Sequence, residues 1–170
     1  MIAAGARAKD LAVAAGDHVS LETERGYHAV VQVDDIGPCT PTMFMDQKVI
    51  VTRMTTGLRI AGQVEIADLD DTPNWKRAEI LRTLLAKVYP ALAQVITSEQ
   101  IDVWMGRRPS TPDGLPCIGR AKASPDVIHA YGHGHVGLAG SARTGRVVAQ
   151  LLTDQTPEIN LAPYSPQRFN

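Results

Sequence analysis

The fold of this chain can be read outward from one stretch, Val127-Ile128-His129-Ala130-Tyr131-Gly132-His133-Gly134-His135-Val136-Gly137, which residues 138–152 follow. The stretch predicts a short apolar strand, a loop with glycine at three positions, and then an amphipathic helix. A glycine loop that enters a helix presents unpaired backbone N–H groups and the positive end of the helix dipole. The loop therefore predicts a site for an anion, or for a ring on which negative charge develops. One face of the helix, at helical spacing, carries Leu138, Ala142, Gly145, Ala149 and Leu152.

Residues 132–137 also fit a second pattern, the GxGxxG of dinucleotide-binding proteins. That fingerprint requires a second parallel strand after the helix, with an acidic residue at its end that holds a ribose. The helix is instead followed by Thr153-Asp154-Gln155-Thr156-Pro157 and a proline-bearing tail without a buried strand pattern. The glycine spacing suits a pyrophosphate site, but its sequence context does not.

Composition narrows the class of protein. The chain has 170 residues, 44% hydrophobic and 21% charged, which is enough for one sizeable core or two small ones. A net charge of −1 argues against nucleic acid or an anionic membrane as a partner, because no basic surplus exists to release counterions. No apolar run approaches the length of a membrane span. Cys39 and Cys117 form no CxxC motif, so a reduced, cytoplasmic protein is expected.

The middle of the chain reads as an antiparallel sheet. Alternating apolar residues predict strands within residues 19–54 and over Leu58–Ile66, the latter with one buried and one wet face. Thr55-Thr56-Gly57 between them is a hairpin signal. A further strand is expected over Gln100–Trp104, and residues 106–116 are too rich in proline and glycine to be regular.

A helix is expected after these first strands. Thr72 is a fair N-cap, Pro73 suits the first helical position, and the helix should end at Tyr89, before Pro90. Its apolar stripe would consist of Ile80, Leu81, Leu84, Leu85 and Val88. Together with the predicted sheet, this helix gives an α+β fold class.

The first residues resemble the middle of an element. Met1 to Ala6 read like the end of a buried strand entering a glycine turn, and Arg7 to Ala15 like a short helix stopped at Gly16. Because compact domains seldom begin in mid-element, we expect the chain to be the C-terminal part of something longer.

Arg107 and Arg108 are the first candidate binding residues, because they lie where a strand opens into residues 109–116. An arginine held rigidly is a natural bidentate partner for a carboxylate. The two arginines could instead be a solvated pair or form a salt bridge to Asp113.

The three histidines His129, His133 and His135 suggest a metal cluster, but no Cys, Asp or Glu lies near them in sequence. We expect one histidine to pack in the strand and the others to line a pocket. Ser141 follows a glycine inside the predicted helix, which is not the strand-to-helix turn of a nucleophile elbow. The sequence does not favour metal or acyl-transfer chemistry.

The same residues resemble a known family. Residues 127–132 fit, position by position, the C-terminal signature of the FAD-dependent D-amino-acid oxidase and dehydrogenase superfamily, and Tyr131 to Leu138 continue the match. Other segments are similar to the family in the same order: Ala3–Ala6 to a flavin-contacting turn, Glu24–Tyr27 to the entry of the substrate domain, Gly57–Gly62 to the central hairpin, and residues 106–119 to the segment G-x-R-P…D-G-x-P-x-I-G.

The resemblance implies two domains and a cofactor. Residues 17–108 would form a substrate-binding domain, with an antiparallel sheet and a packed helix. Residues 1–16 and 109–170 would form the C-terminal portion of a GR2-type FAD-binding domain. Arg108, before the proline of the family pattern, would grip the substrate carboxylate. FAD would be contacted by Gly5, His133, Gly134, His135, Val136, Gly137, Leu138 and Ala139.

The implied activity is oxidation of a D-amino acid to a 2-oxo acid and ammonia, by hydride transfer to the flavin. Two different functions stay open: a non-catalytic remnant or subunit of such an enzyme that needs a partner chain, and a small-molecule-binding module unrelated to redox chemistry. The family's N-terminal βαβ unit, which binds the ADP half of FAD, has no counterpart here. The surface that would pack on the missing half, which includes Ala3, Ala4, Leu138 and the small face of the helix over residues 138–152, should be partly exposed and apolar. We therefore expect the isolated chain to bind FAD weakly or not at all, to be inactive, and to self-associate or need a partner chain.

Overall fold

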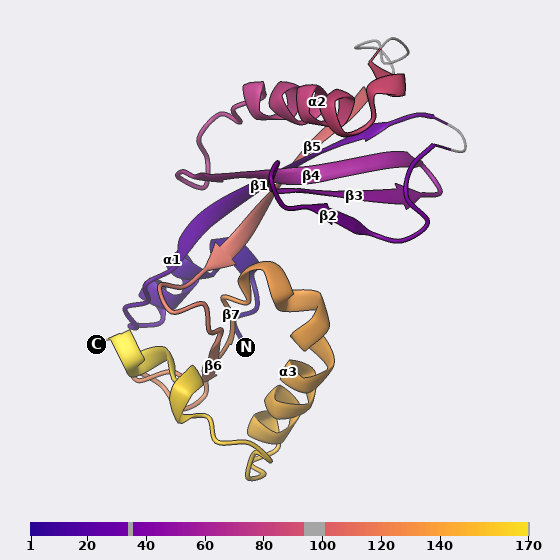
Figure 1. The fold of residues 1–170 in the computed structure, drawn as a ribbon. Coiled ribbons are helices and arrows are strands. Elements are labelled where there is room, and N and C mark those ends of the chain that lie inside the picture. The colour runs from indigo at the N-terminus through magenta and orange to yellow at the C-terminus, as the bar shows by residue number, and fades with distance from the viewer. Residues whose placement is uncertain (34–35, 94–100, 170) are drawn as a thin grey trace. The chain divides into compact units, whose positions relative to one another are not determined.

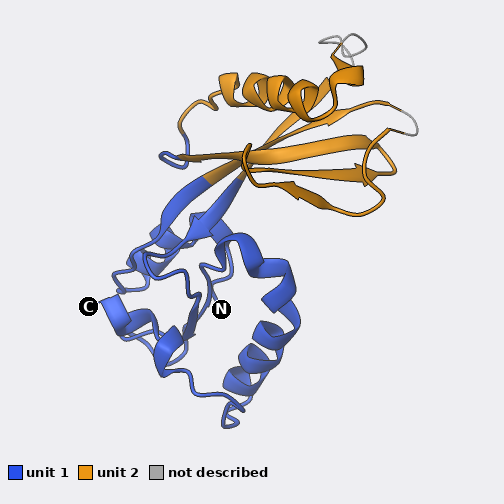
Figure 2. Cartoon of the chain, in the orientation of Figure 1, with its two compact units in different colours: residues 1–24, 66–70, 107–170 blue, residues 25–65, 71–106 orange. Residues whose placement is uncertain are grey.

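The structure is a computed structural model that describes residues 1–33, 36–93 and 101–169. The chain divides into two compact units, which Figure 2 distinguishes by colour. Unit 1 comprises residues 1–24, 66–70 and 107–170, and unit 2 comprises residues 25–65 and 71–106. Helices and strands occur in both units, which confirms the α+β class. In the described part of the chain, no helix has the length and apolarity needed to cross a membrane.

Unit 2 is built on a five-stranded antiparallel sheet with the order β2-β3-β4-β1-β5 (Figure 1). Its strands are β1 (Glu22–Val31), β2 (Thr42–Phe44), β3 (Val49–Met54), β4 (Gly57–Ile66) and β5 (Ile101–Ser110). The start of β1 and the end of β5 belong to unit 1.

The hairpin predicted at residues 55–57 is confirmed. It joins β3 to β4, with Met54 opposite Gly57 in antiparallel register. Gly57 has a φ of +123°, and a Cβ there would lie 2.3 Å from the carbonyl oxygen of Val31. Both the backbone conformation and the close approach of β1 therefore require glycine at this position.

Helix α2 (Lys76–Val88) covers one face of this sheet (Figure 1). Leu81 and Leu85 are fully buried, and Leu84 and Val88 are partly buried against the same core. Ile80 is 45% exposed, so its place in the predicted stripe is wrong. The core that α2 closes contains Tyr27, Ala29, Val31, Val49, Val51, Leu58, Ile60, Leu81, Leu85 and Leu92.

The start of α2 differs from the predicted one, because Thr72 does not cap the helix. The Arg25 guanidinium donates hydrogen bonds to the carbonyl oxygens of Asp71, at 2.8 Å, and Thr72, at 3.3 Å. The backbone N–H of Asn74 donates to the Tyr27 hydroxyl at 3.0 Å. These contacts with β1 fix the segment outside the helix, which begins only at Lys76.

Two expectations about the strands are corrected. Leu58 and Ile60 of β4 are buried, but Ile66 is 68% exposed, so the buried face extends over only the first half of the strand. Strand β5 continues through Pro109 to Ser110, where an irregular loop was expected. Proline is tolerated there because β5 is an edge strand, whose outer N–H groups need no sheet partner. Gln100, the predicted first residue of this strand, lies outside the described residues.

Unit 1 contains a second, smaller sheet, in which β6 (Cys117–Arg120) and β7 (Ile128–Tyr131) pair antiparallel. Ile2 forms a parallel bridge to His129 of β7. Its N–H donates to the Ile128 carbonyl at 2.7 Å, and its carbonyl accepts from the Ala130 N–H at 2.9 Å. The predicted strand end at the start of the chain is thus confirmed, as is the short helix after it, α1 (Ala8–Ala14).

Helix α3 (Gly137–Leu152) packs on β6 and β7. Its buried residues are Val147, Val148 and Leu151, whereas Leu138 and Leu152 are exposed. The face of small residues is exposed, which confirms the prediction for this side of the helix. Branched side chains on the other face bury more apolar area, which decides the orientation.

Short 3-10 helices complete the described chain: η1 (Gly5–Arg7), η2 (Pro90–Leu92), η4 (Gly134–Val136), η5 (Ala162–Tyr164) and η6 (Pro166–Phe169).

Candidate flavin and substrate site

The loop between β7 and α3 leaves hydrogen-bond donors open at the start of the helix. Gly132 and Gly134 have φ values of +84° and +51°, which turn the chain from the strand into η4. The first turn of α3 has neither a side-chain cap nor an acidic residue. Val136 and Leu138, at 61% and 91% exposure, flank these N–H groups with apolar side chains. Donors set among apolar groups suit a flat ring with an electron-rich edge.

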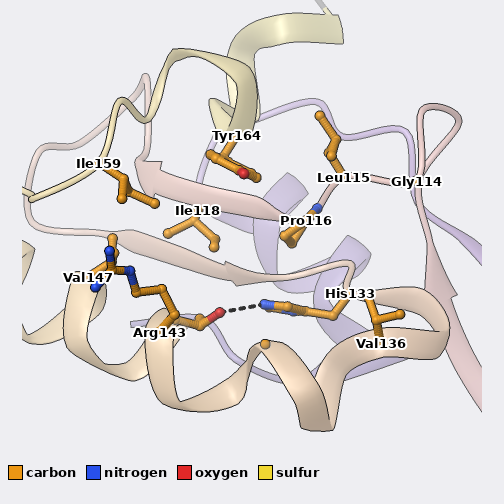
Figure 3. Close-up of a pocket in the computed structure, with 12 residues that line it drawn as sticks. Gly114, Leu115, Pro116, Ile118, His133, Val136, Arg143, Val147, Ile159 and Tyr164 are labelled. Atoms are coloured by element: carbon orange, nitrogen blue, oxygen red, sulfur yellow. Dashed lines mark hydrogen bonds between the residues drawn. The ribbon is translucent and has the colours of Figure 1, made fainter.

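His133 of this loop turns into an apolar cavity of about 260 Å³ (Figure 3). Its Nε2 lies 2.9 Å from the Thr144 hydroxyl of α3. Burial lowers the pKa of the His133 ring below its ordinary value, which favours the neutral ring. The remaining lining is mostly apolar and includes Pro116, Ile118 and Val147.

Glu24 joins the loop to the predicted substrate-binding arginine. One of its carboxylate oxygens, Oε1, lies 3.2 Å from Arg108 Nη1 and also contacts His135 Nε2. The other, Oε2, lies 3.5 Å from the Ser110 hydroxyl. Glu24, Ser110 and residues 132–136 line a second cavity, of about 370 Å³. All of these residues belong to unit 1.

Sequence reasoning did not single out Glu24, which contacts both Arg108 and His135. It stands at the start of β1 among charged residues that alternate without a distinctive pattern. Its partner Arg108 is 84 positions away, so only the pairing of distant segments shows the contact.

Asp113 pairs with Arg168 rather than with Arg107 or Arg108. It accepts two hydrogen bonds from the Arg168 guanidinium, of 2.7 and 3.0 Å. Arg168 holds the pKa of Asp113 well below its usual range. Arg107 is exposed and donates from Nε to the Leu69 carbonyl at 2.7 Å. Of the two neighbouring arginines, Arg108 is therefore the one that forms an ion pair with Glu24, which lines the second cavity.

The histidines divide as expected, with one in the strand and two beside cavities. His129 of β7 is fully buried, and its Nε2 lies 2.7 Å from Asp17 Oδ2. Asp17 also accepts a hydrogen bond from the backbone N–H of Lys122. Its carboxylate therefore joins the segment after α1 to β7 and to the segment after β6. Among residues 1–33, 36–93 and 101–169, no group of three His, Cys, Asp or Glu side chains could hold a metal ion.

Three more of the residues predicted to contact FAD lie at the starts of helices. Gly137 is half-buried at the start of α3, and Ala139 is exposed on its first turn. Gly5 begins η1 with a φ of +56°, and open space lies where its side chain would be. Ser141, on the same helix, donates to the Leu138 carbonyl at 2.7 Å, an ordinary intrahelical bond.

Comparison with known proteins defines the class as FAD-dependent oxidoreductases. The model of the DAO family, described as FAD dependent oxidoreductase, matches residues 1–151, and the chain therefore belongs to this family. It is 56% identical over 169 residues to a D-amino-acid oxidase of Bradyrhizobium diazoefficiens. That match covers 99% of this chain and 40% of the oxidase, so the chain spans well under half of that relative.

Two further matches agree with the family. An uncharacterized oxidoreductase of the pyp 5'region of Halorhodospira halophila is 33% identical over 172 residues, which are 99% of this chain and 77% of that protein. The crystal structure of glycine oxidase from Geobacillus kaustophilus has a TM-score of 0.80 at 25% identity, covering 96% of this chain and 44% of the enzyme.

The loop and the start of α3 fit the isoalloxazine end of FAD. The uncapped first turn supplies backbone donors, and the exposed side chains of Val136 and Leu138 supply an apolar surface for a ring. The donor set contains no acidic side chain in that turn that would repel negative charge. This fit concerns only the ring of the cofactor: the loop and the first turn of α3 are not proposed to contact the ADP half.

Proposed function

We propose that this protein takes part in the FAD-dependent oxidation of a D-amino acid, which yields a 2-oxo acid and ammonia. The observation that carries the proposal is the chain of contacts from Arg108 through Glu24 to His135 of the loop. It links a carboxylate-binding side chain to the residues that fit the flavin ring. The D-amino-acid oxidase of Bradyrhizobium diazoefficiens, 56% identical to this chain, supports the substrate class.

FAD, when bound, supplies the acceptor for two electrons. The protein's own contribution is orientation and charge. Arg108 offers a planar fork of N–H donors that fits a carboxylate and fixes the direction in which Cα presents its hydrogen. Loss of a hydride and a proton from the amino acid leaves an imino acid, which water hydrolyses to the 2-oxo acid and ammonia.

The start of helix α3 would stabilise charge on the flavin ring. Its backbone N–H groups and the positive end of its dipole would stabilise negative charge at the adjacent edge of the ring. Because these donors are fixed by the fold, they need no rearrangement when the charge forms. Under this proposal, His133, Gly134, His135, Val136, Gly137, Leu138 and Ala139 surround the ring, and Gly5 contributes from its own turn.

A second candidate function is that of a subunit that needs a partner chain. Leu138 is 91% exposed, and Ala3, Ala4 and Leu152 are exposed as well. Exposed apolar groups of this kind favour association. In this case the chain alone would bind FAD weakly or not at all, and it would form larger assemblies.

Gel filtration with a visible spectrum on the same fractions tests both candidates. The subunit proposal expects the purified 170-residue chain to elute larger than a monomer and without bound flavin. A monomeric, yellow and active chain would overturn that proposal. The oxidase proposal expects D-amino acids to reduce the flavin in any flavin-containing form. Flavin that no D-amino acid reduces would overturn it.

A further inference from the structure

We infer that Glu24 binds the α-ammonium group of the substrate, so that Arg108 and Glu24 together recognise a zwitterion. This inference rests on the proposed function and names a specificity-determining residue for it. Arg108 and Glu24 form an ion pair at 3.2 Å, with side-chain exposures of 29% and 17%. A neighbouring cation and anion are complementary to an α-amino acid, whose carboxylate and ammonium are separated by a single carbon.

The geometry leaves each partner able to bind a ligand. Arg108 uses Nη1 for Glu24, and the other N–H donors of its guanidinium can bind a carboxylate. Glu24 uses Oε1 for both Arg108 and His135. Its Oε2 meets only the Ser110 hydroxyl within the described residues, at 3.5 Å, the outer limit of a hydrogen bond. That oxygen is therefore the natural acceptor for an ammonium group.

The charge of the site favours a zwitterion over a simple carboxylate. A ligand with a carboxylate alone would bring its negative charge close to Glu24, and the two charges would repel. An amino acid brings an ammonium group to the same place, which offsets the repulsion. The pair therefore selects amino acids against the corresponding 2-hydroxy acids or simple carboxylic acids.

Glu24 also lines the cavity that the ligand would enter. The cavity of about 370 Å³ is bordered by Glu24, Ser110 and the glycine loop. The Glu24 carboxylate also contacts His135, which lines the same cavity, so an alternative role of Glu24 is to hold that ring in place. Both roles are compatible, but they predict different effects on ligand discrimination.

NMR titration of the 170-residue chain separates these roles. D-Alanine and propanoate, which differ by the amino group, are titrated while the Arg108 Nε–H and His135 ring signals are followed. The wild type should bind D-alanine more tightly than propanoate. Glu24→Gln should weaken D-alanine binding about tenfold, the scale of a lost hydrogen bond to a charged group, and leave propanoate unchanged or tighter.

Matched variants make the result decisive. Glu22→Gln removes an exposed carboxylate of the same strand, which pairs with Lys9, and should change neither affinity. Glu24→Asp keeps the charge and should retain a preference for D-alanine, which also covers the case in which Glu24→Gln does not fold. Equal changes for both ligands in Glu24→Gln, or no preference in the wild type, would overturn the inference. Because these titrations need no flavin, failure of the oxidase proposal would show separately, as flavin that D-amino acids do not reduce.

Discussion

Replacing Asp17 by alanine should destabilise unit 1 by about 2 kcal/mol, because the buried His129 ring loses its partner at a cost of roughly 1–3 kcal/mol. The Asp17 carboxylate is almost fully buried and binds the fully buried His129 at 2.7 Å and the Lys122 N–H at 3.0 Å. His129 Nδ1 already has no hydrogen-bond partner, so the variant would leave both ring nitrogens unsatisfied. The expected loss is the middle of the range for the His129 ring alone, because Lys122 is exposed and water can replace Asp17 at its N–H.

Urea denaturation of the chain measures this loss, with circular dichroism as the signal for both units. Asp17→Asn is the matched control, because its amide can still accept from Lys122 and donate to the His129 ring. The asparagine variant should lose only about 1 kcal/mol, since neutral hydrogen bonds are weaker than charged ones. The fluorescence of Trp75 and Trp104, which both lie in unit 2, reports separately on that unit. A free energy of unfolding for Asp17→Ala within about 1 kcal/mol of the wild type would refute the reasoning.

Three further predictions concern single positions. In a catalytically active form, Arg108→Lys keeps the charge but loses the bidentate fork, so the KM for D-amino acids should rise by the equivalent of about 2–4 kcal/mol; an unchanged KM in Arg108→Ala would remove this residue from the substrate site. Gly57→Ala would place a methyl group 2.3 Å from the Val31 carbonyl oxygen at a φ of +123°, and thermal denaturation should show a loss of about 1–3 kcal/mol; an unaltered melting temperature would speak against this backbone. Because Arg168 lowers the pKa of Asp113, their pair stabilises the fold above about pH 4, the unfolded pKa, and the stabilisation is lost as the pH falls further. Urea midpoints of Asp113→Asn should therefore lie below those of the wild type at about pH 7 and approach them towards about pH 2, whereas a constant gap would contradict the assignment.

Elements set by local sequence could be predicted from the chain. The hairpin at residues 55–57 and the order of strand, loop and helix from β7 to α3 are both confirmed. In each case glycine marks the position where the backbone needs a positive φ, and the flanking periodicity defines the element type. The family signature lies in the same short segments, which is why the sequence alone pointed to it.

Features set by distant contacts could not be predicted. The N-terminus of α2 is displaced because Arg25 and Tyr27 of β1 bind the backbone before it. The residues with which α3 packs on β6 and β7, Val147 and Leu151 among them, were not predicted, because only the contact with those strands selects them. The contact between Glu24 and Arg108 could not be predicted for the same reason, because the two residues are 84 positions apart.

The link between Arg168 and the loop at residues 111–116 has a consequence for biosynthesis. That loop borders both cavities, and Arg168 holds it through Asp113 and the Leu115 carbonyl. Asp113 and Arg168 are 55 positions apart. At a translation rate of about 5–20 residues per second, roughly 3–11 s separate the synthesis of the loop from that of its anchor. The hydrogen bonds that hold this loop at the two cavities can therefore form only after that delay, so the cavity borders are completed late in the synthesis of these residues.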